Sequence, residues 1–276
     1  MIMVTGATGN VGGALLRALI SAGHSPVALT RHAPEPGSGV MHRPFDYTSQ
    51  AGYERAFSGA KSAFIMTPPG QPLEASHLTA ALARAKVEHV VLLSSQGAAT
   101  RPESPAHAGL RTLEAALQSA SIATTVLRPG GFASNSFAWI PTVRARAMVT
   151  APFADVALPI VDPLDIAEVA ATTLLNGEHR GSELTLTGPA LISPRQQTAE
   201  LGQALGRQLT FQELTHAEAS AFMGQFMPSP IVEGTLDILG APNAAELRIS
   251  TDIERVLGKP ARPYGEWATR NRHAFL

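Results

Sequence analysis

The 276-residue chain contains no cysteine. This absence excludes disulfides, thiolate zinc sites, iron–sulfur clusters and a thiol nucleophile, and it fits the reducing environment of a cytoplasm. The chain also has no excess of charge of one sign, because it contains 21 basic and 22 acidic residues and its net charge is −1. Without a basic field to attract nucleic acid or an anionic membrane, we expect neither as a partner.

Long apolar runs are also missing, since none approaches the roughly 18 residues that a membrane-spanning helix needs. Residues 1–5 already have the pattern of a buried strand, so we expect no signal peptide. The nine histidines form no H-x-x-x-H or H-x-H pair near carboxylates, so we predict no metal site. These absences favour a cytoplasmic protein. We expect a monomer or homodimer that acts on a small molecule.

In the first half of the chain, short apolar runs alternate with segments whose apolar residues recur at helical spacing. The runs have the length and composition of buried strands, at residues 1–5, 26–30, 63–67, 89–95 and 123–128. Such strands separated by helices indicate a parallel sheet that is covered on both faces. We therefore predict an α/β fold, a Rossmann-type doubly wound parallel sheet. Residues from about 1 to 150 would form this core, and residues from about 151 to 276 a smaller, mainly helical substrate lobe interleaved with it in a single domain.

Capping residues mark the helices of the second half. Ser193 and Thr215 each open a capping box, and Asp162 precedes a proline at the first helical position. Thr251 is expected to cap a helix through Leu257. Between these helices, residues 182–187 have the pattern of one more strand. Glycines at helix ends predict the stops, at Gly23, Gly177, Gly206 and Gly258.

Three glycines at a spacing of three follow the first strand directly and open the first helix, in the run Gly6-Ala-Thr-Gly9-Asn-Val-Gly12. Glycines permit a tight turn and a close approach of the backbone to a ligand, and a helix N-terminus offers free N–H groups to a pyrophosphate. The spacing G-x-x-G-x-x-G departs from the commonest fingerprint, G-x-G-x-x-G. The strand–loop–helix context nevertheless favours a dinucleotide site over a glycine-rich turn without a ligand.

The end of the second strand favours NADP(H) over NAD(H). An acidic residue there would bind the ribose 2′-hydroxyl of NAD, but this strand is followed by Arg31. A guanidinium pairs with a 2′-phosphate, which an acid would repel. The alternative is a solvated surface arginine, which is the usual state of this residue type.

Several segments together resemble the NmrA-like atypical short-chain dehydrogenases, a family that includes NAD(P)H:quinone oxidoreductases and dye reductases. The resemblance runs nearly end to end. It lies in Val4–Gly12, in Phe45-Asp46, in Leu92-Leu-Ser-Ser95, in the run Thr125–Asn135 of the form L-R-P-x-x-F-x-x-N, and in later segments around Asp165, Leu186 and Leu205.

The resemblance implies roles for individual residues. Thr8, Gly9, Asn10 and Val11, with Gly6 and Gly12, would hold the pyrophosphate, and Arg31 would meet the 2′-phosphate. Asp46 would lie on the adenine side. The ribose and nicotinamide would be lined by Thr67, Pro68, Ser94 and Ser95, and then by Pro129, Gly130 and Phe132.

Typical short-chain dehydrogenases transfer a proton through a Tyr-x-x-x-Lys pair. Counted back from Glu114, the corresponding positions here are Ala106 and Leu110, and neither side chain can carry a proton. This departure argues against ordinary alcohol–ketone chemistry. It does not argue against hydride transfer to an acceptor that takes its proton from water, because the cofactor carries the hydride chemistry.

His107 is the ionisable residue best placed to replace the tyrosine, since a histidine titrates near neutrality. The alternative is a histidine of the first helical turn without a catalytic role. For the substrate side our candidates are Gln96, Phe132, Asn135 and Trp139. Phe132 and Trp139 would form an apolar wall for a flat molecule.

Two functions from different classes follow. The first is an NADPH-dependent oxidoreductase that transfers hydride to a small aromatic or conjugated acceptor, such as a quinone or azo compound. The second is a non-catalytic NADP(H)-binding redox sensor that regulates a protein partner, which the missing Tyr/Lys pair favours. An isomerase or epimerase on the same fold is a third and weaker hypothesis.

Overall fold

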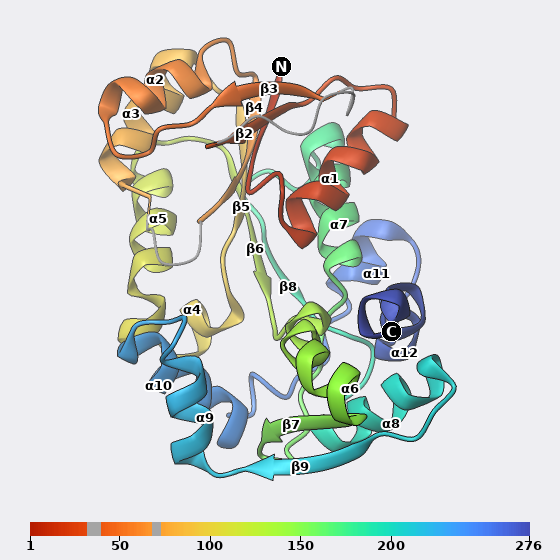
Figure 1. Cartoon of the computed structure of the whole chain (residues 1–276). Helices are drawn as coiled ribbons and strands as arrows, with labels where there is room; N and C mark the ends of the chain where they lie inside the picture. The colour runs from red at the N-terminus through yellow and green to blue at the C-terminus, as the bar shows by residue number, and fades with distance from the viewer. Residues whose placement is uncertain (32–39, 68–72) are drawn as a thin grey trace. The chain divides into compact units, whose positions relative to one another are not determined.

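The computed structural model describes residues 1–31, 40–67 and 73–276 (Figure 1). These residues form two compact units that alternate along the chain. Unit 1 contains residues 1–95, 109–128 and 163–184, and unit 2 contains residues 96–108, 129–162 and 185–276. The prediction of a single domain, with a core of residues 1 to about 150 and a lobe from about 151 to 276, stays a prediction.

A seven-stranded sheet in the order β3-β2-β1-β4-β5-β6-β8 organises unit 1. The pairings from β3 through β6 are parallel. Along the chain the strand order runs outward from β1 to β3 and then resumes on the other side at β4, so the direction reverses between β1 and β4. Ligands of such sheets bind beyond the carboxyl ends of the strands at this reversal. The strands are β1 (Ile2–Thr5), β2 (Val27–Thr30), β3 (Met41–Pro44), β4 (Ser62–Met66), β5 (His89–Leu93), β6 (Thr124–Pro129) and β8 (Glu183–Leu186).

Helices cover both faces of this sheet. Helices α1 (Asn10–Ser21) and α7 (Pro163–Asn176) pack together on one face (Figure 1). On the other face, α2 (Gln50–Phe57), α3 (Ala75–Ala85) and α5 (Ala108–Ser119) share an apolar core with the inward side chains of the strands. Alternation along each strand supplies side chains to both faces. The predicted doubly wound α/β fold of Rossmann type is confirmed.

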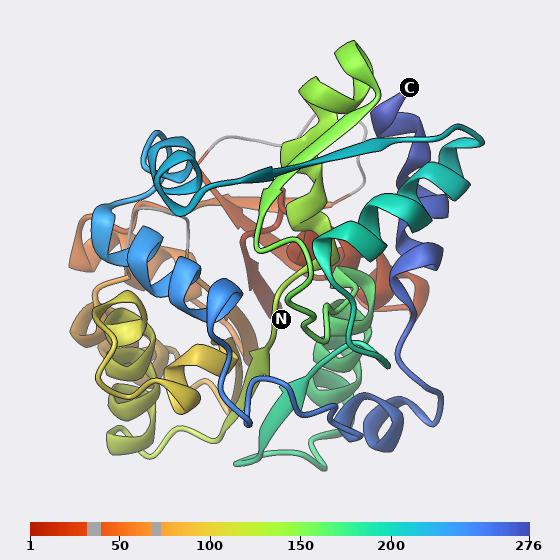
Figure 2. The same cartoon turned by 90° about the horizontal axis from the view of Figure 1, so that it is seen from below.

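Unit 2 contains a second sheet, made of the parallel strands β7 (Met148–Pro152) and β9 (Thr210–Leu214) (Figure 2). One apolar core of this unit gathers the aromatic side chains of the C-terminal region around Trp267 and Phe275. The remaining elements are α4 (Gln96–Thr100), η1 (Pro105–His107), η2 (Ala133–Trp139), α6 (Ile140–Arg146), α8 (Pro194–Leu205), α9 (His216–Met223), α10 (Ser229–Gly240), α11 (Asp252–Leu257), α12 (Tyr264–Asn271) and η3 (Arg272–Phe275). Across the ranges that the structure describes, no helix is both long and apolar enough to cross a membrane.

Local capping follows the sequence at two of the three serine or threonine positions. Ser193 and Thr215 both form complete capping boxes. The prediction that Thr251 caps α11 with its side chain is wrong. With φ −94° and ψ 5°, Thr251 lacks the extended backbone of a capping residue, and Ser250 Oγ accepts the Asp252 N–H instead, at 3.1 Å.

Candidate functional site

The glycine loop after β1 is folded so tightly that its third glycine admits no side chain. The Gly9 N–H donates to the Gly6 carbonyl at 2.9 Å, and Gly6 has a φ of +61°. A Cβ on Gly12 would lie only 2.2 Å from the Gly6 carbonyl oxygen. Helix α1 starts at Asn10, and no side chain caps it. The loop therefore presents the N-terminus of a twelve-residue helix, which suits an anion.

The end of β4 lies beside this loop, at the point where the strand order reverses. Thr5 Oγ1 accepts the Met66 N–H at 2.6 Å and donates to the Met66 carbonyl at 3.1 Å, which ties the carboxyl ends of β1 and β4 together. The next residue is Thr67, whose Oγ1 is buried and has no hydrogen-bond partner among the described residues. A buried hydroxyl normally has a partner, so this atom fits a ligand hydroxyl. Pro68 lies outside the described residues.

Arg31 and Asp46 are both exposed, but the Asp46 carboxylate already accepts hydrogen bonds from its neighbours. Arg31 is exposed directly after β2. Asp46 is also exposed, but its carboxylate accepts the Thr48 N–H at 2.9 Å and the hydroxyls of Thr48 and Ser49 at 2.6 and 2.7 Å. These bonds lower the pKa of Asp46 to about 2. Asp46 thus stabilises the turn before α2, and its role on the adenine side stays a prediction.

A charged network lies at the carboxyl ends of β5 and β6 in unit 1. Ser94 donates its hydroxyl proton to Glu114, and Arg128 pairs with Glu114 at 2.6 Å and with Glu183. The hydrogen bond to Glu114 is the main cause that raises the pKa of Arg128. The Ser94 hydroxyl therefore donates its proton to a protein side chain, Glu114. The predicted contacts of Ser94 and of the half-buried Ser95 with a ribose or nicotinamide stay predictions.

The segment after β6 brings two of the predicted residues together in unit 2. The Gly130 N–H donates to the Leu186 carbonyl at 3.0 Å, and Phe132 pairs with Val161. A Cβ on Gly130 would lie 3.3 Å from Gln96 Oε1, and Gln96 is buried. Gln96 and Gly130 are thus neighbours, although the rest of α4, η1, α5 and β6 lie between them in the chain.

The other two substrate candidates lie in η2. Asn135 is exposed. Trp139 is half-buried and packs against the aromatic core of unit 2, so its ring already has protein neighbours. Contact of either residue with a substrate stays a prediction.

The position that we align with the missing tyrosine, Ala106, is half-buried and lies against α10. A Cβ on Gly234 of α10 would lie 2.5 Å from Ala106 Cβ and 3.1 Å from Ser104 Oγ. The neighbouring His107 is half-buried, and its ring packs on Gly97, where an added Cβ would lie 2.4 Å from Nε2. His107 therefore has a packing role, and its role as a proton donor stays a prediction.

Groups of three or more side chains able to hold a metal ion are not found within the described ranges. Among the described residues, two polar networks were not predicted from the sequence: Ser94–Glu114–Arg128–Glu183 in unit 1 and one around Glu246 in unit 2. Glu246 stands in the plain run Ala244-Ala-Glu-Leu247, and no pattern marks it there.

Comparison with known proteins gives relatives that extend over the whole chain. The chain is 33% identical over 283 residues to the (4-alkanoyl-5-oxo-2,5-dihydrofuran-3-yl)methyl phosphate reductase of Streptomyces griseus, covering 100% of this chain and 99% of the relative. It is 28% identical over 285 residues to the NAD(P)H azoreductase of Xenophilus azovorans, with the same coverage of 100% and 99%.

A solved structure shares the fold. The NADPH-dependent quinone oxidoreductase QOR2 of Escherichia coli, complexed with NADPH, superposes with a TM-score of 0.81 at 23% identity, over 98% of this chain and 99% of that one. The model of the NmrA-like family matches residues 1–238. The resemblance seen in the sequence is confirmed, and the chain belongs to the NmrA-like family.

Proposed function

We propose that this protein is an NADPH-dependent reductase of small aromatic or conjugated acceptors such as quinones and azo compounds. The chain is an NAD(P)H-dependent oxidoreductase, in line with relatives that are named reductases over their full length. The observation that carries the proposal is the glycine loop, where Gly12 meets the Gly6 carbonyl so closely that only a hydrogen fits. Such a loop at the reversal of strand order is the place for a dinucleotide pyrophosphate.

The residues present fit the cofactor. The loop from Gly6 to Gly12 would hold the pyrophosphate, and Thr67 Oγ1, which has no partner among the described residues, would meet a ribose hydroxyl. Arg31 would pair with the 2′-phosphate, which is the basis for proposing NADPH over NADH. When bound, the reduced nicotinamide supplies a hydride, that is two electrons and one hydrogen nucleus.

The protein's own part in the reaction is to bind and orient the acceptor. Gln96 and the chain around Gly130 and Phe132 would line its place in unit 2. The second hydrogen of the product would come from water, because we align Ala106 with the missing acid and α10 covers that residue. Quinones and azo compounds suit this arrangement, since the anion formed by hydride addition takes a proton from water.

The test follows NADPH absorbance while the purified protein is offered quinones, azo dyes, enones and aliphatic ketones. We expect oxidation with quinones or dyes and none with ketones. Gly12→Ala serves as the control, because its added Cβ would displace the loop and abolish cofactor binding. Tight NADPH binding without oxidation by any acceptor would overturn the proposal in favour of a non-catalytic redox sensor.

A further inference from the structure

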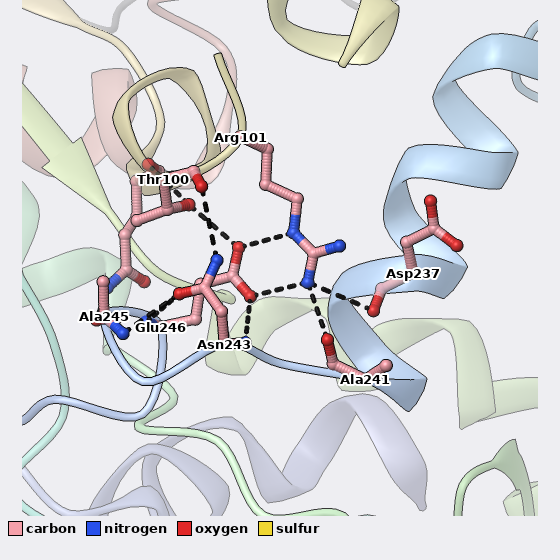
Figure 3. A network of polar contacts seen from close by, with 8 residues as sticks. Thr100, Arg101, Asp237, Ala241, Asn243, Ala245 and Glu246 are labelled. Atoms are coloured by element: carbon pink, nitrogen blue, oxygen red, sulfur yellow. Dashed lines mark hydrogen bonds and ion pairs between the residues drawn. The ribbon is translucent and has the colours of Figure 1, made fainter. Parts of the chain in front are cut away.

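An ion pair between the half-buried Arg101, the residue after helix α4, and the buried Glu246 joins the end of α4 to the chain after α10 (Figure 3). The Glu246 side chain is only 2% exposed, and Arg101 binds it with two nitrogens, each 2.8 Å from one carboxylate oxygen. Arg101 also donates to the Ala241 carbonyl at 2.7 Å. A bidentate pair of this kind fixes both partners in one geometry.

Further hydrogen bonds complete the surroundings of Glu246. The Thr100 hydroxyl donates to Oε1 at 2.8 Å, and the Asn243 N–H donates to Oε2 at 2.9 Å. Burial alone would raise the pKa of Glu246, but the bonds from Arg101, Asn243 and Thr100 together lower it. The carboxylate therefore stays charged, and it holds residues 241–246 against the C-terminal end of α4.

The same segment holds the first residue of α4. Gln96 Nε2 donates to the Ala245 carbonyl at 2.9 Å. Ala245 and Glu246 both donate their N–H groups to Asn243 Oδ1, at 3.0 and 3.1 Å, so the peptide that carries this carbonyl is itself fixed (Figure 3). Glu246 thus acts on Gln96 through the backbone of its own neighbour.

This contact decides which way the Gln96 carboxamide points. A carbonyl only accepts hydrogen bonds, so the NH₂ group must face Ala245 and Oε1 must face Gly130. The Gly130 N–H does not compete for Oε1, because it donates to the Leu186 carbonyl. An oriented acceptor consequently lies beside the segment that we propose to line the substrate.

We propose that the Arg101–Glu246 pair is a positioning device, which holds Gln96 Oε1 as the acceptor for a hydroxyl or N–H donor on the substrate. The inference rests on the proposed function and narrows its substrate class. Conjugated acceptors with a donor group next to the reducible system would be preferred over acceptors without one.

Two matched probes test this inference, a hydroxymethyl-substituted naphthoquinone and its methoxymethyl counterpart, which differ only in the donor. One hydrogen bond supports a preference of about tenfold in kcat/KM for the hydroxymethyl compound. We expect Gln96→Leu to remove this preference. Glu246→Gln should reduce it to about threefold by raising the KM of the hydroxymethyl compound, with kcat and the NADPH dissociation constant nearly unchanged.

Asp162→Asn is the matched control, because Asp162 is 2% exposed and pairs with Arg270 elsewhere in unit 2. It should lower the unfolding temperature without changing the preference. Thr100→Val, which leaves the ion pair in place, provides a milder variant if Glu246→Gln does not fold. The inference is overturned if every variant keeps the preference, or if Glu246→Gln weakens both compounds equally.

Equilibrium binding of the two probes in the presence of NADP⁺ separates this inference from the proposed function. A preference in binding that depends on Gln96, without any turnover, would support the inference and overturn the reductase proposal. Turnover of both probes at equal efficiency by the wild-type protein would do the reverse.

Discussion

In the function that we propose, a single side chain selects NADPH over NADH, and water rather than a side chain supplies the proton. Gly12 permits the tight loop because it has no side chain, since any Cβ there would clash with the Gly6 carbonyl. Arg31 is exposed directly after β2, where we propose that its charge meets the 2′-phosphate. Asp46, which we predicted on the adenine side, has a carboxylate that already accepts hydrogen bonds from Thr48 and Ser49.

Arg31→Ala tests the choice of cofactor. Loss of the guanidinium removes a charge-assisted contact with the 2′-phosphate, so we expect the dissociation constant for NADPH to rise about tenfold or more and that for NADH to change little. Fluorescence titration with both cofactors measures the two constants. Arg84→Ala, which removes an exposed arginine of α3, is the control. Equal weakening of NADPH and NADH would refute the assignment of Arg31.

His107→Gln tests the source of the proton. Because the ring packs on Gly97 and the acceptor is proposed to take its proton from water, we expect quinone turnover to stay within about threefold across pH. General acid catalysis contributes about a hundredfold or more, so a loss of that size would instead make His107 the donor. The measurement is the pH profile of kcat for the wild-type protein and the variant.

At the scale of helices and strands, the packing of α10 limits the size of the side chain at position 106 of η1. Gly234 of α10 lies directly over Ala106, and the two elements make extensive contact. A tyrosine at position 106 would add a ring at this close contact, where α10 leaves little space.

We therefore expect the double change Ala106→Tyr, Leu110→Lys to destabilise the protein without creating a ketone reductase. Overpacking of this kind costs about 1–3 kcal/mol. Thermal unfolding and NADPH oxidation with aliphatic ketones are the two readouts, and Ala80→Tyr at an exposed position of α3 is the control. Ketone reduction by the double variant would show that only the missing pair separates this chain from ordinary short-chain dehydrogenases.

Elements with strong local patterns could be predicted from the sequence. The buried strands of the sheet and the capping boxes at Ser193 and Thr215 are confirmed, because apolar runs and reciprocal caps depend on neighbouring residues alone. Strand β3 gave no such pattern, since Met41-His-Arg-Pro44 is largely polar and lies at the edge of the sheet. Strands β7 and β9 were also not predicted.

The parts of the candidate site that lie in one contiguous segment could be predicted from the sequence. The parts that depend on contacts between distant residues could not. Gly6 to Gly12 form one contiguous loop, which the order of strand, glycines and helix predicts. The bond from Gln96 to Ala245 joins residues 149 positions apart, and no spacing in the chain indicates it. The same holds for Thr251, whose backbone angles are not those of a side-chain cap, so that the Asp252 N–H donates to Ser250 Oγ instead.

For the whole molecule, His89 makes folding stability depend on pH. It is 1% exposed in β5, and burial, followed by the charge of Arg180, lowers its pKa from 6.5 to about 4. Between these values the unfolded chain binds a proton that the folded chain does not. Stability therefore falls as the pH drops from 6.5 toward 4, by up to about 3 kcal/mol.

His89→Gln should flatten this part of the stability profile. Chemical denaturation at several pH values across the window measures the slope. His24→Gln, at an exposed position, is expected to leave the slope as it is in the wild-type protein. A slope that survives in His89→Gln would assign the pH dependence to other groups.

The cytoplasmic location and the monomeric or homodimeric state stay predictions from the sequence. The function of the molecule as a whole depends on whether bound NADPH gives up its hydride. Family membership is shared by enzymes of several acceptor classes, so fold alone does not decide this question.

The most direct measurement is a single turnover, in which the protein with bound NADPH is mixed with excess quinone, once with ordinary NADPH and once with NADPH deuterated at the transferred hydride. We predict that the reduced nicotinamide is oxidised by the quinone, and more slowly when the hydride is deuterium. If bound NADPH stays reduced with every quinone and azo acceptor, the protein is not the reductase proposed here and binds the cofactor for another purpose.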